Sequence, residues 1–443
     1  MKKLTAVALS LYTSIALAQT STFHNIVVNG TATFAGATSF TAPPTSVTPA
    51  LTDNSTNVAT TAFVRGAAIG CPNIVAYGGV GDGTTDNVSA AAAALAANPS
   101  GRACIYFPPG KFYFSTSLAF SILTSPGSVT LLGAGIDVTE LTFGATSYPG
   151  VLIYYKDKYS SAHIRDMTIT ARGTAANYGI NLIQTATSVN SGQGQYGLTD
   201  ITNVTLRGSD GYGLTNYWGV GVKIDGVSNI NFYNVNTIGP NNVAGFGIAL
   251  DYAPNNHSII PVVYNLFGCN FLQMTAGFLY AGNAQGVSIV SSNFTANTYG
   301  IQAPSTGTNA LDQLTVSNSQ FNNSGFSIDT ESPVQAVTLV GNLFFVQNNT
   351  AAVVLNQSTQ FSITGNNFVP ASIPATGQIG VQIGTYNQGA GVITGNSFDA
   401  VSFGVNLTSG SQHVNVQANA YAPAIGTKVT NSGTNNSVGA ATP

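Results

Sequence analysis

The chain has 443 residues, of which only 6% are charged, with 12 Lys and Arg against 15 Asp and Glu. Soluble globular domains carry about a quarter charged residues, so the polar surface must come from uncharged side chains. Disorder is excluded because 44% of the residues are hydrophobic. Electrostatic binding of nucleic acid is excluded because it requires clustered Lys and Arg. The 49 glycines favour a long β structure with many turns.

The amino terminus has the pattern of an export signal. Lys2 and Lys3 precede an apolar stretch over 4–18, which ends in small residues before Gln19. We expect a cleaved signal peptide over 1–18, the alternatives being an uncleaved anchor or a chance apolar start. No later segment reaches about 18 unbroken apolar residues, so no membrane span is expected. In an exported protein Cys71 and Cys104 could form a disulfide, although the sequence alone does not bring them together.

The segment between the signal and the main domain has a different composition. The motif "LTDNSTNVATTAFVRGA" over 51–67 resembles the attachment segment that precedes the main domain in many phage tail-fibre and tailspike proteins. The resemblance implies an attachment region over 19–72, a possible homotrimer and a place in a virion tail. The alternative is a linker that contains one short helix.

The next motif carries a second resemblance. Residues 73–118, "NIVAYGGVGDGTTDNVSAAAAALAANPSGRACIYFPPGKFYFSTSL", resemble the opening of the pectate-lyase-like superfamily of right-handed parallel β-helices. Within it, 77–86 is a Gly/Asp turn cluster that we expect to lie outside any strand interior. A helix is expected through Ala90–Ala97, covering the first rung of a parallel stack. Asp82 and Asp86 are interpreted as turn and cap residues.

A repeat with a terminal aromatic residue runs through the second half of the chain. The aromatic residues fall at spacings of 23, 27, 23, 24, 30 and 23 residues, namely Phe271, Phe294, Phe321, Phe344, Phe368, Phe398 and Tyr421. Four units also contain an asparagine two residues before the aromatic, and these are Asn342, Asn366, Asn396 and Asn419. The repeat predicts a parallel β-helix of about three strands per coil and ten rungs, with the asparagines stacked as a hydrogen-bonded ladder.

A second repeat indicates where chemistry could occur. It reads Gly, apolar, variable, apolar, then one residue expected to be exposed, and the fifth positions are Ile183, Asp225, Asp251, Ala281, Pro304, Asp329, Asn356, Gly384 and Thr408. Asp225 and Asp251 fall on successive rungs, and stacked strands lie about 4.8 Å apart. Carboxylates about 5 Å apart suit a retaining glycosidase, so this pair is our candidate acid and nucleophile or base.

The residues around this pair suit a sugar. The candidate substrate-binding residues are Asp210, Tyr217, Trp218, Lys223, Tyr252 and His257. The alternatives are that Asp225 and Asp251 only satisfy backbone amides at strand ends, or that they hold a cation. Two weaker clusters are His163 with Arg165 and Asp166, where the last two could simply pair, and Asp329 with Glu331 as an alternative acid pair.

These patterns predict an all-β protein, a right-handed parallel β-helix over 73–425 with a flexible tail over 426–443. The expected function is binding and cleavage of an extracellular polysaccharide by a tailspike-like hydrolase or lyase, secreted or carried on a virion tail. No cofactor or metal is expected. Neither the polygalacturonase motifs nor the Asp-rich calcium site of pectate lyases occurs, so the resemblance to the superfamily does not by itself assign a reaction. The alternative function is a non-catalytic glycan-binding adhesin or tail-fibre shaft.

Overall fold

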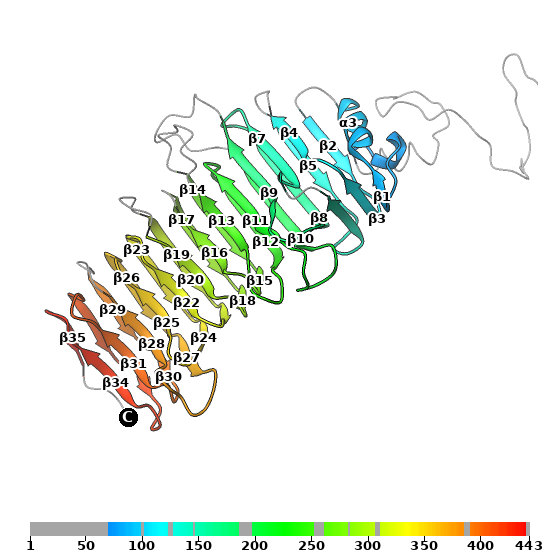
Figure 1. The fold of residues 1–443 in the computed structure, drawn as a ribbon. Helices are drawn as coiled ribbons and strands as arrows, with labels where there is room; N and C mark the ends of the chain where they lie inside the picture. Colours follow the sequence, from blue (N-terminus) through cyan, green and yellow to red (C-terminus); the bar gives the residue numbers. More distant parts are fainter. Residues whose placement is uncertain are drawn as a thin grey trace, which may run out of the picture.

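The structure is a computed structural model that describes residues 70–98, 102–122, 127–144, 147–185, 197–251, 261–281, 284–305, 311–384 and 390–439. The predicted export signal over 1–18 and the tail-fibre-like motif over 51–67 lie outside these residues. Within them the chain forms an elongated stack of parallel strands (Figure 1). Among the described residues, no helix has the length and apolar character needed to cross a membrane.

The strands form two parallel sheets. Sheet A has 23 strands: β1 (Asp82–Asp86), β2 (Arg102–Tyr106), β3 (Gly110–Phe114), β5 (Ser128–Leu132), β6 (Thr139–Phe143), β8 (Ser161–Ala171), β10 (Thr199–Gly208), β12 (Ile230–Ile238), β14 (Val262–Phe267), β15 (Asn270–Leu272), β17 (Gln285–Val290), β18 (Asn293–Thr295), β20 (Asp312–Ser317), β21 (Gln320–Asn322), β23 (Ala336–Val340), β24 (Leu343–Val346), β26 (Gln360–Thr364), β27 (Asn367–Pro370), β29 (Gly391–Thr394), β30 (Ser397–Phe398), β32 (Val414–Gln417), β33 (Ala420–Tyr421) and β35 (Ser437–Val438). Sheet B has 12 strands: β4 (Leu118–Ile122), β7 (Val151–Tyr155), β9 (Ala176–Gln184), β11 (Trp218–Asp225), β13 (Phe246–Asp251), β16 (Ala276–Tyr280), β19 (Tyr299–Ala303), β22 (Phe326–Thr330), β25 (Ala351–Leu355), β28 (Ile379–Ile383), β31 (Phe403–Leu407) and β34 (Thr427–Asn431).

Each coil contributes strands to both sheets. The consecutive strands β14, β15 and β16 are followed by β17, β18 and β19, which pair with them in the same order. The predicted right-handed parallel β-helix with three strands per coil is therefore confirmed. Within the described ranges, the twelve strands of sheet B give twelve rungs, slightly more than the approximately ten expected.

Two internal columns hold the coils together, and the sequence analysis predicted the one formed by asparagines. The rings of Phe271 through Tyr421 stack continuously, with centroids 4.7 to 5.3 Å apart. Beside them the buried asparagines form the expected ladder, in which the Nδ2 of Asn342 donates to the Oδ1 of Asn366 at 2.9 Å and Asn366 in turn donates to Asn396 at 3.0 Å. The ladder satisfies polar groups that would otherwise be orphaned in the core.

The helix α3 (Val88–Ala96) lies at the amino-terminal end of the stack (Figure 1), and it contacts the 3-10 helix Ile74–Tyr77. Asp82 accepts hydrogen bonds from the backbone amides of Thr84 and Thr85, as its interpretation as a turn residue requires. The turn cluster nevertheless contains β1, because Asp82 and Asp86 pair irregularly with β3, so its exclusion from strands was wrong. Cys71 and Cys104 form a disulfide.

The carboxyl-terminal boundary also requires correction. β34 pairs with β31 and β35 pairs with β32, so the β-helix continues to Val438, whereas the sequence predicted a flexible tail from residue 426. The short strands were missed because their side chains are mostly polar and half-buried or exposed. Their backbone hydrogen bonds to the preceding coil hold them in place.

Candidate functional site

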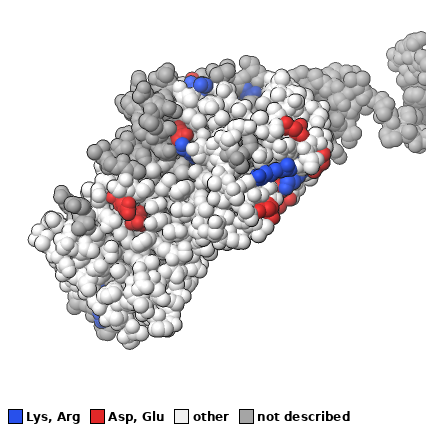
Figure 2. Space-filling view, viewed as in Figure 1, with Lys and Arg blue, Asp and Glu red and all other residues white. Residues whose placement is uncertain are grey.

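The outward face of sheet B carries the acids singled out in the sequence. One row of Cα partners crosses this face, formed by Asn181, Lys223, Ala249, Leu279, Gln302, Asp329, Val354, Gln382 and Asn406. The residues on either side of each, such as Val222 and Ile224, point into the core. We call this surface the sheet B face. Figure 2 shows that charged side chains are sparse on the side it draws and gather in a few small groups.

Asp225 and Asp251 lie on adjacent rungs as Cα partners of β11 and β13. Asp225 is only 6% exposed, which corrects the expectation of an exposed side chain. An outward-facing residue need not be exposed: its Oδ1 lies 3.4 Å from the Nζ of Lys223, which also lies over the ring of Tyr178 at 5.0 Å. The side chain of Asp251, and all of Tyr252 and His257, lie outside the described part of the chain.

The aromatic and acidic residues of the insertion before β11 have different roles from those expected. Trp218 is 2% exposed, and its Nε1 donates to the carbonyl of Ile169 at 3.1 Å, so its ring belongs to the core and cannot stack on a sugar. Asp210 accepts the backbone amides of Thr215 and Asn216 at 2.9 and 3.0 Å, which closes the loop on itself. Both side chains are therefore structural.

Tyr217 does lie in a pocket. The pocket has a volume of about 480 Å³ and is bounded by the loops that precede β11 and β13, with Thr174, Leu214, Thr215, Tyr217, Asn241 and Asn242 as its lining. Its side chains are mainly polar and uncharged, which suits a ligand rich in hydroxyl groups. Of the predicted substrate-binding residues, Tyr217 has the setting closest to expectation.

The pairing of β22 with β19 places Asp329 in a different column from the one predicted. Ile301 pairs with Ile328 and Gln302 with Asp329, so Asp329 belongs to the row of Lys223, and Glu331 follows two positions later on the strand's course. The Gly-apolar pattern at Gly325 led to the misplacement, because Ser327 occupies the rung position that Gly300 has on β19. Both acids lie at the sheet B face: Asp329 lies in the row of Lys223, and Glu331 follows the end of β22 beside Pro304, in the column first assigned to Asp329.

The surroundings of Asp329 favour the protonated form of its carboxyl group, as a proton donor requires. It is 5% exposed, and burial, followed by repulsion from Glu331, raises its pKa to about 6. Glu331 is exposed, and its Oε2 accepts the backbone amide of Ser305 at 3.4 Å. Tyr299 stacks on Phe326 at 5.6 Å, and burial and then the charges of both acids raise the pKa of its phenol. A buried acid, an exposed acid and an aromatic pair thus lie together.

A second polar cluster lies on sheet A. The sequence suggested that Arg165 pairs with Asp166, but the guanidinium instead binds Asp200 on the next strand, through Nε at 2.7 Å and Nη2 at 2.8 Å. His163 binds the same carboxylate through Nδ1. Asp166 adopts a positive φ of 59° and accepts the side-chain amide of Asn203, so it lies at a bend within β8. Asp200 was missed, although it precedes the strand motif "ITNVTL" just as His163 opens "HIRDMTI".

A network of charges near the amino-terminal end was also missed. Arg207 binds Asp137 at 3.0 Å and lies 3.7 Å from Glu140, which pairs with Lys111 at 2.6 Å. Tyr212 donates a short hydrogen bond to Asp137. Burial opposes ionisation of Asp137, but the hydrogen bonds from Tyr212 and Arg207 outweigh it and lower its pKa. Each acid has a basic partner, which indicates a structural role.

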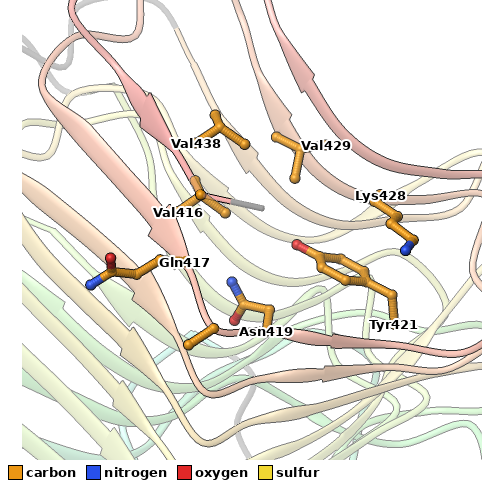
Figure 3. Close-up of a pocket in the computed structure, with 9 residues that line it drawn as sticks. Val416, Gln417, Asn419, Tyr421, Lys428, Val429 and Val438 are labelled. Carbon is orange, nitrogen blue, oxygen red and sulfur yellow. The ribbon is translucent and has the colours of Figure 1, made fainter. Parts of the chain in front are cut away.

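In the described residues, neither a further pocket nor a cluster of metal-binding side chains is a better candidate for the functional site than the sheet B face. The open carboxyl-terminal end of the core forms a pocket of about 240 Å³, where Tyr421 ends the aromatic column and Asn419 ends the ladder (Figure 3). Val416, Val429 and Val438 make this pocket largely apolar. Within the described ranges, no group of three or more His, Cys, Asp or Glu side chains could hold a metal ion.

Comparison with known proteins shows which folds and sequences the chain is similar to. Over 149 residues it is 28% identical to the pre-neck appendage protein of Bacillus phage B103, a stretch that covers 31% of this chain and 16% of that protein. The solved structures it resembles share the fold, at sequence identities of 15 to 16%.

Three of these solved structures, an epimerase module and two phage proteins, show how similar the chain is to proteins of different kinds. The Azotobacter vinelandii mannuronan C-5 epimerase AlgE4 A-module has a TM-score of 0.60 and 15% identity, covering 83% of this chain and all of that one. The N-terminal fragment of bacteriophage Phi29 gene product 12 has a TM-score of 0.53 and 15% identity over 79% of this chain and 66% of that one. Bacteriophage CBA120 tailspike protein 3 has a TM-score of 0.52 and 16% identity over 83% and 60%.

The family assignment rests on a longer match. The model of the family described as rhamnogalacturonase A/epimerase, pectate lyase-like, matches residues 71–372, well over half of the chain. These residues include the disulfide, α3 and the rungs from β1 to β27. The chain belongs to the rhamnogalacturonase A/epimerase, pectate lyase-like family.

Proposed function

We propose that the protein binds an extracellular polysaccharide along the sheet B face and cleaves it, as a glycoside hydrolase or a polysaccharide lyase. Support comes from the family, whose name describes carbohydrate-active enzymes, and from the similarity to a tailspike and a phage appendage protein. The face is long and mainly uncharged, as suits a neutral or weakly charged glycan chain. Tyr217 and Lys223 are the proposed binding residues at its amino-terminal half.

The observation that carries the catalytic proposal is the burial of Asp329 on the same face as the exposed Glu331, a setting that raises the pKa of Asp329 to about 6. A carboxylic acid that keeps its proton near neutral pH can donate it to a glycosidic oxygen. The Glu331 carboxylate then acts as the nucleophile or as the base that activates water. Asp329 is therefore the proposed acid, and Glu331 its partner.

Asp225 and Asp251 form the alternative catalytic pair on the same face. Their Cα atoms are partners on adjacent rungs, as the sequence analysis required. The contact of Asp225 with Lys223 also fits a structural ion pair, and this favours the second candidate function, a non-catalytic glycan-binding shaft or adhesin. In that case the polysaccharide binds the face without being cleaved.

The oligomeric state and the location of the protein are proposed from its similarity to phage tail proteins. We propose a homotrimer that is carried on a virion tail or secreted, with the segment over 19–72 as its attachment region. The similarity to a tailspike and a phage appendage protein supports the tail location, whereas the trimer and the attachment region rest on the resemblances described for the sequence. Neither the trimer nor the attachment region depends on which acid pair is catalytic.

The test is incubation of the full chain with a panel of bacterial exopolysaccharides and pectic polymers, followed by assay of reducing ends and unsaturated uronates. On a polymer that the parent cleaves, Asp329→Asn and Glu331→Gln should each lower turnover by about 10²-fold or more. Asp399→Asn is the control, because Asp399 is an exposed acid that directly follows β30 of the other sheet. Loss of activity in Asp225→Asn and Asp251→Asn alone would transfer catalysis to that pair. Binding without cleavage across the panel would establish the shaft.

A further inference from the structure

A hydrogen-bonded relay of three side chains lies on the outward face of sheet A. Ser161 and His163 lie two residues apart on the same face of β8, and Asp200 is the Cα partner of His163 on β10. The Oγ of Ser161 lies 3.4 Å from the Nε2 of His163, whose Nδ1 binds the Oδ1 of Asp200. The order is therefore hydroxyl, imidazole, carboxylate. None of these residues belongs to the sheet B face.

The hydrogen-bonding partners of His163 determine which of its two ring nitrogens carries the proton. Arg165 binds Asp200 through two nitrogens, and although burial raises the pKa of this carboxyl, the hydrogen bonds from His163 and Arg165 lower it to about 2. A carboxylate only accepts hydrogen bonds, so the Nδ1 of a neutral His163 must carry the proton. Its Nε2 then has a free electron pair directed toward Ser161. This tautomer is the one that a general base for a serine nucleophile requires.

We propose that Ser161, His163 and Asp200 form a serine esterase site, a second activity that is separate from polysaccharide cleavage. The distance from Ser161 to His163 is slightly longer than a tight hydrogen bond, as is common before a substrate binds. Arg165 binds both oxygens of Asp200 and so holds this carboxylate in place against His163.

The step is balanced without any cofactor. The Oγ of Ser161 bonds to the acyl carbon while its proton moves to the Nε2 of His163. The ester C–O bond breaks, and the leaving alkoxide takes this proton and departs as an alcohol. Water then attacks the acyl-serine, giving its proton to Nε2, from which it returns to Ser161 as the carboxylic acid leaves.

The surroundings indicate the class of ester. The row of His163 and Asp200 continues into Thr130 on one side and Asn231 and Asn265 on the other, so the neighbouring side chains are polar. The site lies on the face of a sheet, and its three residues do not line the pocket at Tyr217 or the one at the carboxyl-terminal end. A short acyl group on a hydroxyl-rich alcohol fits this setting, and the substrate class is an acetyl ester of a carbohydrate.

The first test measures hydrolysis of p-nitrophenyl acetate by the full chain. Ser161→Ala and His163→Gln should each lower the enzymatic rate by about 10²-fold or more, the range expected for loss of a nucleophile or general base. Ser128→Ala is the matched control, because Ser128 is the Cα partner of Ser161 on β5 and has the same partial exposure. Its rate should equal that of the parent. Circular dichroism establishes that each variant is folded.

Two further measurements identify the nucleophile and the substrate class. A fluorophosphonate probe should label the peptide that contains Ser161, as read by mass spectrometry, and the parent should release acetate from glucose pentaacetate. Neither probe contains a bond between two sugars, so failure of the proposed polysaccharide cleavage would not affect these results. A parent rate no higher than that of Ser161→Ala, or labelling at another serine alone, would overturn the esterase site.

Discussion

Asn366 receives two hydrogen bonds from Asn342, one from its backbone amide and one from its side-chain Nδ2, both at 2.9 Å. The backbone amide and the Nδ2 of Asn366 in turn donate to the Oδ1 of Asn396. Its own Nδ2 also donates to the carbonyl of Leu339. A single buried side chain therefore satisfies polar groups of two coils, and the same contact recurs from rung to rung, which fixes how each coil sits on the next.

Replacing Asn366 by alanine should destabilise the β-helix strongly. The change leaves the amide of Asn342 and the carbonyl of Leu339 buried without their partner, and each such loss costs roughly 1–3 kcal/mol. We expect a fall of roughly 2–5 kcal/mol in the free energy of unfolding, measured by urea denaturation. Asn367→Ala, at the exposed neighbouring position, is the control and should change little. Equal effects of the two variants would show that the ladder does not stabilise the fold.

Phe344→Ala should also be costly, because the ring is fully buried between Phe321 and Phe368, each 4.9 Å away. The cavity predicts a loss of roughly 3–5 kcal/mol. Phe345→Ala is the matched control, since Phe345 is the next residue and only half-buried on the opposite side of β24. Thermal unfolding of the two variants compares them directly. A near-neutral Phe344→Ala would contradict the continuous aromatic column.

The fold could be predicted because each coil repeats the same inward-facing residues. The glycine of the second repeat is one example: a Cβ at Gly277 would lie 2.7 Å from the ring of Phe294, so close packing requires glycine there. The position of each polar residue in the stack was harder to predict from the sequence. Turn lengths differ between coils, and the pattern at Gly325 matched the repeat although Ser327 occupies its place in the stack.

Partners that are distant in the sequence were the hardest to predict. Arg165 and Asp200 are 35 residues apart, and nothing local to Arg165 distinguishes Asp200 from the adjacent Asp166. Trp218 directly follows a loop of half-buried and exposed residues, yet it is the first residue of β11 and its side chain points inward. Burial of a polar or aromatic side chain depends on neighbouring coils, which a local pattern does not contain.

Deleting residues 19–70 should weaken oligomerisation while leaving the β-helix folded. The reason is the resemblance of 51–67 to attachment segments of trimeric tail proteins, whereas Cys71, α3 and every strand of both sheets remain in the shortened chain. Light scattering of the mature chain and of the deletion variant measures the change in mass. Circular dichroism should remain dominated by β structure. A monodisperse monomer for the mature chain would remove the proposed trimer.

Lys223 and Asp225 should be energetically coupled if their contact is structural. Their charged atoms are 3.4 Å apart, with side chains 18% and 7% exposed, so solvent screens the pair only in part. Lys223→Met and Asp225→Asn should each destabilise the protein, and the double variant should lose less than the sum of the two. A double-mutant cycle in urea should give a coupling of roughly 1 kcal/mol or more. No coupling would favour Asp225 as a catalytic acid over a structural one.

Asp329→Asn should stabilise the protein at alkaline pH even as it removes the proposed proton donor. Burial and Glu331 raise the pKa of Asp329 from 3.8 to about 6, so the folded chain holds this proton more tightly than the unfolded chain does. The contribution of Asp329 to stability is therefore complete below pH 3.8 and is lost as the pH rises through about 6. Asparagine has no charge to bury, so at about pH 8 the variant should exceed the parent by up to roughly 3 kcal/mol, and the gain should nearly vanish at about pH 4. Urea denaturation at both pH values measures the difference, with Asp399→Asn as the exposed control. A gain that does not depend on pH would show that Asp329 does not hold its proton in the folded state, and the acid role proposed for it would fail with it.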